Sequence, residues 1–214
     1  LHPDVAIITN IDYDHPDICP TLEDYDRAFV DFVSGMRAGG TLVISIDDPG
    51  CARVMARADW RPGVEVVTVG ASPRATWRIE RTDEGVRVVG KDDVAVSLAL
   101  RVPGEHNLQN AAAALAALTV LGYDASAAAA ALADFPGVGR RFELKGEANG
   151  VVVIDDYAHH PREIQVNLQA ARERFGYRRI WALSQPNTYS RLKALLVGFS
   201  TAFEHADQVM ILDV

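Results

Sequence analysis

The chain has 214 residues and a formal net charge of −8, and its Lys and Arg residues form no long block. This balance argues against a general role in binding nucleic acid and against a polybasic membrane surface. No apolar run approaches the roughly 20 residues that span a bilayer, and no signal-peptide pattern is present, so we expect a cytoplasmic protein. The two cysteines, Cys19 and Cys51, match no metal-binding or redox spacing.

The N-terminal part of the chain alternates between apolar runs of strand length and segments with helical spacing. Buried strands are predicted at residues 5–9, 41–46 and 65–69. Helices are predicted between them at residues 21–36 and 51–58. This β-α-β-α-β order is typical of a parallel sheet.

Residues 76–100 follow a different pattern, in which apolar residues alternate with others around a turn at residues 83–85. This alternation predicts an antiparallel hairpin. Alanine-rich helices are predicted at residues 111–121 and 125–133, and residues 136–139 have the composition of a linker.

After the linker, the alternation of strands and helices returns. Strands are predicted at residues 151–154, 179–183 and 209–212, and helices at 163–174 and 191–204. We therefore predict an α/β fold with two consecutive parallel-sheet (Rossmann-like) units, the first with an antiparallel hairpin region. The units would cover residues 1–137 and 138–214. Because both chain ends lie close to a predicted strand, we expect a fragment of a longer protein.

The most informative segment is residues 155–161, D-D-Y-A-H-H-P. It places two carboxylates, a phenol and two imidazoles at the carboxyl end of a predicted strand, before a helix that Pro161 would open. Ligands of open α/β sheets bind at this edge. The alternative is a helix cap made by Asp155 or His160. A cap accounts for one polar residue and not for five, so a ligand site is favoured.

Two further polar clusters lie earlier in the chain. Residues 9–17 combine Asp and His, which suit a divalent cation or a phosphate-linked network, although a solvated acidic loop explains them at least as well. In residues 104–110, Asn107 and Asn110 share one helix face, and their amides suit the edge of a nucleotide base. N-capping by Asn107 is the alternative, and it leaves Asn110 unexplained.

Two arginine-containing clusters follow. The arginine pair in residues 139–142 can grip a phosphate or carboxylate, with a solvated surface pair as a serious alternative. Arg191, in residues 185–191, lies at a helix start, against the helix dipole. Either a ligand anion or a distant acidic side chain would account for its position.

Five motifs, in this order, resemble those of the Mur ligase family, ATP-dependent amide-forming enzymes of peptidoglycan synthesis. They occupy residues 9–15, 104–111, 137–142, 155–161 and 184–192, so the resemblance covers nearly the whole chain. The D-D-Y-A-H-H-P element is highly specific, and five ordered motifs together are more specific still.

The chain departs from the family pattern at four positions. Asp12 stands where the family usually has Glu, and Ser184, Asn187 and Leu192 replace Phe, His and Thr. Asn187 removes an imidazole from the amino-acid side of the site, which bears on the choice of amino acid.

The resemblance implies a three-domain ligase, of which this chain is the later part of the central ATPase domain and the first half of the C-terminal domain. The P-loop would precede Leu1. The implied reaction uses ATP to join L-alanine to UDP-N-acetylmuramate through an acyl phosphate. Two alternatives stay open: a related ligase that recycles murein tripeptide onto the same sugar nucleotide, and a non-catalytic homologue that binds nucleotide.

The resemblance also implies residues for Mg²⁺ and ATP. His15 would bind magnesium, and Asn110 would hydrogen-bond the adenine in a pocket shaped by His106 and Asn107. Arg141 would contact ATP.

The reacting groups would meet near the D-D-Y-A-H-H-P motif. Asp156, Tyr157 and His159 would line the cleft where ATP and the muramoyl substrate meet. Arg191 would hold the anionic substrate or the amino acid. The sequence predicts no oligomeric state.

Overall fold

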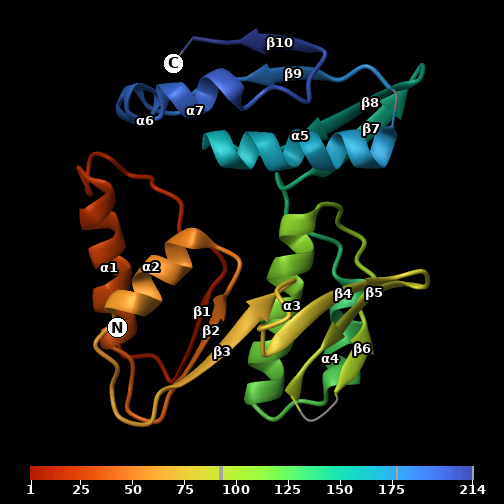
Figure 1. The fold of residues 1–214 in the computed structure, drawn as a ribbon. Coiled ribbons are helices and arrows are strands. Elements are labelled where there is room, and N and C mark those ends of the chain that lie inside the picture. The colour runs from red at the N-terminus through yellow and green to blue at the C-terminus, as the bar shows by residue number, and fades with distance from the viewer. Residues whose placement is uncertain (92–93, 177, 214) are drawn as a thin grey trace. The chain divides into compact units, whose positions relative to one another are not determined.

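The computed structural model describes residues 1–91, 94–176 and 178–213. The chain divides into two compact units, each built from segments that are discontinuous in sequence (Figure 1). The first unit contains Leu1–Tyr13, Cys19–Leu100 and Leu108–Asp134, and the second contains Asp14–Ile18, Arg101–Asn107 and Phe135–Val214. Among the described residues, no helix is both long and apolar enough to cross a membrane.

One six-stranded sheet forms the centre of the first unit. Its strands, in spatial order, are β1 (Val5–Ile8), β2 (Thr41–Ser45), β3 (Glu65–Gly70), β4 (Trp77–Thr82), β5 (Gly85–Val89) and β6 (Ala95–Ser97). The first four strands pair in parallel and the last three are antiparallel, which confirms the predicted parallel sheet with a hairpin region.

Helices cover both faces of this sheet at β2, an interior strand that is apolar on both sides. Leu42 and Ile44 of β2 pack in one core with α1 (Leu22–Ser34) and α2 (Pro49–Arg57). Val43 points the other way and packs in a second core with α3 (Glu105–Val120) and α4 (Ala125–Asp134). These three side chains of β2 are fully buried, as expected for a parallel strand between two helix layers.

The second unit contains two separate two-stranded sheets. One is the antiparallel hairpin of β7 (Glu143–Ala148) and β8 (Val151–Asp155), and the other is the parallel pair β9 (Trp181–Ser184) and β10 (Gln208–Ile211). The predicted α/β class is confirmed, but β7 was not predicted. The alternation of strands and helices also did not reveal that β8 and β9 belong to different sheets.

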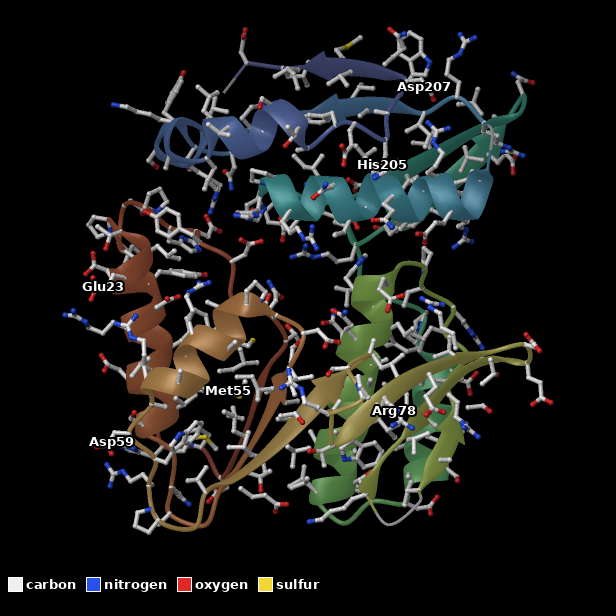
Figure 2. All side chains as sticks on the ribbon, viewed as in Figure 1. Glu23, Met55, Asp59, Arg78, His205 and Asp207 are labelled. Carbon is white, nitrogen blue, oxygen red and sulfur yellow. The ribbon has the colours of Figure 1, made fainter. Side chains whose placement is uncertain are left out.

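The helices of the second unit differ in part from the prediction. Helix α5 (Pro161–Phe175) was predicted, whereas the single helix expected at 191–204 is two short helices, α6 (Tyr189–Ala194) and α7 (Leu196–Thr201). Arg172 of α5 donates to the carbonyl oxygen of His205 (2.9 Å) and to the Asp207 carboxylate (2.8 Å), beside β10; Figure 2 labels both acceptors. These bonds tie α5 to the chain that enters β10.

A cavity of about 850 Å³ lies in the second unit. Its wall is mainly apolar and includes Val152 and Ile154 of β8, Leu168 and Ala171 of α5, and Ala182 of β9. Among the described strands, β8 and β9 are not paired with each other, and both line this cavity.

Candidate functional site

The D-D-Y-A-H-H-P motif lies where the sequence placed it, between the end of β8 and the start of α5. His160 is the N-cap of α5, and its Nδ1 accepts the N–H of Arg162 at 3.2 Å. Pro161 follows in the first turn, where its missing N–H costs nothing. The capping alternative is therefore correct for His160 and leaves the other polar residues of the motif to be explained.

Asp156 uses both carboxylate oxygens to accept backbone N–H groups. Oδ1 accepts from Ala158 and Oδ2 from Phe142, both at 2.7 Å. The second bond joins the motif to residues 140–142, which lie in the left-handed backbone region at Arg140 (φ 58°) and Phe142 (φ 49°). Non-glycine residues rarely adopt this conformation, so Asp156 stabilises an unfavourable backbone shape around Arg141.

The two arginines of this segment have different partners. The Arg140 guanidinium lies 4.7 Å from the centre of the Tyr157 ring. The backbone carbonyl oxygen of Arg140 accepts the N–H of Tyr157 at 2.8 Å. Arg141 Nη1 donates to Glu163 Oε1 at 3.3 Å. The side chain of Arg141 is half exposed, and since a guanidinium carries five N–H donors, this bond leaves Arg141 able to bind an anion.

His159 is oriented through its Nδ1 atom, which lies 2.8 Å from the carbonyl oxygen of Tyr157. A carbonyl oxygen only accepts, so Nδ1 carries a hydrogen and Nε2 of the neutral ring is free to accept a proton. The Tyr157 and His159 rings also pack edge to face at 5.0 Å. His159 therefore has the geometry of a proton acceptor.

Arg191 forms a second group with Asp14 and His15, all within the second unit. Its Nε donates to Asp14 Oδ1 at 2.6 Å and its Nη2 to Oδ2 at 3.3 Å. Burial raises the pKa of the Asp14 carboxyl, but the hydrogen bond from Arg191, the hydrogen bond from the His15 backbone N–H and the charge of Arg191 together hold that pKa below its usual value. Asp14 is thus the distant acidic partner considered for Arg191, while the buried Nη1 of Arg191 has no hydrogen-bond partner among the residues that the structure describes.

His15 lies beside this ion pair, with its backbone at φ 55° and its Nε2 3.7 Å from Asp14 Oδ2. Among the described residues, no group of three or more His, Cys, Asp or Glu side chains is arranged to hold a metal ion. Because Arg191 already engages Asp14, the described residues do not form a complete magnesium site around His15.

The G-x-H-N-x-x-N segment begins helix α3, which starts at Glu105 and not near residue 111. N-capping by Asn107 is therefore wrong: this residue lies inside the helix, and its Nδ2 donates to the Pro103 carbonyl at 2.6 Å. His106 Nδ1 is buried and has no hydrogen-bond partner in the described part of the chain, and burial lowers the pKa of its imidazole. Asn110 is exposed and belongs to the first unit.

The structure thus brings together several predicted site residues in the second unit. Arg141, Asp156, Tyr157 and His159 share one hydrogen-bonded network, and the charges of Asp156 and Arg141 also act on His106. Arg191 and His15 form the separate group around Asp14. Asp156 is the only one of the nine predicted site residues that lines the large cavity.

Sequence reasoning missed two residues of these networks. Glu163 links Arg141 to the motif, and its signal was its position three residues after the helix cap, where a carboxylate completes a capping box. Asp14 pairs with Arg191, and no sequence pattern connects residues so far apart.

The fold and these networks define an α/β protein of two units with its polar motifs at strand ends and helix starts. Two family models match the chain. The model of the Mur ligase middle domain matches residues 1–118, and the model of the Mur ligase glutamate ligase domain matches residues 140–214. The chain belongs to the Mur ligase family.

The relatives carry a more specific name. The chain is 40% identical to the UDP-N-acetylmuramate–L-alanine ligase of Roseiflexus sp. (strain RS-1), over all of this chain and 49% of that protein. It is 48% identical to the ligase of the same name from Clavibacter michiganensis subsp. michiganensis, over 98% of this chain and 44% of that protein. The crystal structure of UDP-N-acetylmuramate–alanine ligase from Thermotoga maritima is 31% identical, with a TM-score of 0.72 over 99% of this chain and 46% of that chain. The chain thus spans about half the length of these relatives.

Proposed function

We propose that this chain is part of an ATP-dependent ligase that joins L-alanine to UDP-N-acetylmuramate. The observation that carries the proposal is that relatives 40–48% identical over essentially the whole chain bear that name. The network around Arg141 and His159 supports a catalytic protein over a non-catalytic homologue, because one carboxylate, Glu163, contacts both an anion-binding group and the residue that carries a proton acceptor. We place the reaction and its substrates in the cytoplasm.

The proposed reaction has two steps. A carboxylate oxygen of the lactyl group attacks the γ-phosphorus of ATP, ADP leaves, and an acyl phosphate forms. The amine nitrogen of L-alanine then attacks the acyl carbon, phosphate leaves, and a proton is lost from the nitrogen. Phosphate is needed because a free carboxylate is a poor acyl donor.

The chain's own residues would act on charge and on the proton. Arg141 would bind a phosphate oxygen of ATP, where a guanidinium offsets the charge on the transferring group. Nε2 of His159 would accept the amine proton, and the unpaired Nη1 of Arg191 would bind a substrate carboxylate. Asn110, His106 and Asn107 would contact the adenine. His15 stays a predicted magnesium ligand, and no step is derived through that ion.

Release of ADP by the full-length protein tests the proposal. We expect ADP only when ATP, UDP-N-acetylmuramate and L-alanine are all present. Murein tripeptide replaces L-alanine in the comparison reaction. Faster ADP release with the tripeptide would favour the recycling ligase, and no ADP with either amine would contradict a ligase.

A further inference from the structure

Glu163 joins two segments of the site through one carboxylate. Oε1 accepts from Arg141 Nη1 at 3.3 Å. Oε2 accepts the backbone N–H groups of His159 at 3.0 Å and His160 at 3.2 Å. The Glu163 carboxylate therefore accepts three hydrogen bonds, one from Arg141 and two from residues 159–160, which are distant from Arg141 in sequence.

On the arginine side, Glu163 acts on a side chain that is otherwise free to move. The backbone around Arg141 is fixed, because Asp156 accepts the N–H of Phe142 and Glu143 accepts the N–H of Arg140 at 2.8 Å. Those bonds do not restrain the guanidinium, which lies at the end of a long, half-exposed side chain. Glu163 gives the guanidinium a fixed partner and so selects one of its many rotamers.

On the histidine side, Glu163 fixes the backbone that carries the imidazole. His159 N and His160 N are donors at the start of α5, and Glu163 satisfies both. Glu163 Oε2 also lies 3.7 Å from His159 Nδ1. The carboxylate thus sets the position of His159 relative to Arg141.

The charge of Glu163 is maintained by these contacts. Burial raises the pKa of its carboxyl, but the hydrogen bonds from the backbone N–H groups of His159 and His160 and from the Arg141 side chain together hold that pKa below its usual value. Glu163 is therefore ionised near neutral pH.

We propose that Glu163 is a positioning residue of the ligase site, which holds the Arg141 guanidinium in register with His159. This inference rests on the proposed function, in which Arg141 contacts ATP. Glu163 itself touches no reacting group and acts through Arg141.

Glu163→Gln separates this role from that of a helix cap. Glutamine keeps the length of the side chain and one carbonyl oxygen, which can still accept the N–H groups of His159 and His160. Its amide group then faces Arg141 with N–H donors, so the link to the guanidinium is lost. A cap alone predicts an almost normal protein, whereas a positioning residue predicts weaker ATP binding.

The experiment is a double-mutant cycle on ATP affinity in the full-length protein, with wild type, Glu163→Gln, Arg141→Ala and the double variant. We expect Glu163→Gln to raise the Kd for ATP by about three- to tenfold, a modest change because the ion pair is partly exposed. In the Arg141→Ala background, Glu163→Gln should have no further effect, and melting temperatures should stay close to wild type. Asp124→Ala, which removes the bond to Ala127 N at the start of α4, is the control for lost capping and should leave the ATP Kd unchanged.

Equal ATP affinity of wild type and Glu163→Gln would overturn the inference, and so would independent effects of the two substitutions. The proposed function fails separately, if wild type releases no ADP with its three substrates. In that case the cycle on ATP affinity still decides whether Glu163 positions Arg141. Wild type that binds no ATP would overturn both.

Discussion

Both oxygens of Asp156 are engaged by backbone N–H groups, and this limits what the residue can contribute. The resemblance to the Mur ligase family implied a role for Asp156 in the reacting cleft. The geometry adds a second role, since Asp156 supports the left-handed backbone on either side of Arg141. Asp155, its neighbour, makes only long ion pairs with Arg140 (3.7 Å) and Lys145 (3.9 Å). We therefore expect Asp156 to contribute much more than Asp155 to the stability of the second unit.

Asp156→Asn should lower the free energy of unfolding of the second unit by about 1–3 kcal/mol. Asparagine keeps one accepting oxygen but turns N–H donors toward a backbone N–H, so one hydrogen bond is lost and two donors face each other. Urea unfolding monitored by circular dichroism measures the change. The matched control is Asp155→Asn, which should cost less than about 0.5 kcal/mol because its ion pairs are long and partly exposed. Equal losses in the two variants would mean that the backbone bonds of Asp156 contribute little.

At the scale of elements, the sequence predicted most accurately the strands whose apolar side chains pack in the cores of the first unit. Apolar runs and helical spacing were sufficient for β1 to β3, because the apolar side chains of these strands pack in the two cores of the first unit and leave a strong local pattern. β7 was missed because it is polar and exposed along most of its length. The signal that could have found it is the turn Asn149-Gly150, whose two residues both have positive φ, as a tight hairpin requires.

The candidate site, like the fold, could be predicted from the sequence only in part. The D-D-Y-A-H-H-P motif and its place at the end of a strand followed from composition and order. The bond from Asp156 to Phe142, the link from Glu163 to Arg141 and the pair of Asp14 with Arg191 depend on tertiary placement. Periodicity along one segment contains no information on such contacts, so the network could not be derived from it.

The separate sheets of the second unit lead to a prediction about hydrogen exchange. Among the described strands, β8 pairs only with β7 and β9 only with β10, so alternate backbone N–H groups of β8 and β9 lack a partner strand. In the 214-residue chain, these amides should exchange orders of magnitude faster than those of β2, which pairs on both edges. Amide exchange followed by NMR measures this directly. Uniform protection across β8 and β9 would show that the strands pair in solution and close the cavity.

At the scale of the whole molecule, the two units differ in how completely they bury their apolar side chains. The first unit encloses its sheet between two helix layers, and its interior strand β2 is buried along its whole length. In the second unit, large apolar side chains of the strands stay exposed, among them Trp181 (57% exposed), Leu183 (65%) and Val153 (54%). Since burial of apolar area supplies most of the stability of a fold, the second unit should be the less stable one.

The 214-residue chain should therefore unfold in two steps in urea, the second unit at the lower concentration. Trp181 lies in the second unit, and Trp77, 4% exposed, reports on the first. We expect Trp181→Phe to remove the low-urea step from tryptophan fluorescence while circular dichroism still records it, because replacing an exposed side chain barely changes stability. The high-urea step should keep its fluorescence change, which comes from Trp60 and Trp77 of the first unit moving into water. A single transition that coincides in both signals would mean that the units unfold together, and that the exposed strand faces of the second unit do not weaken it.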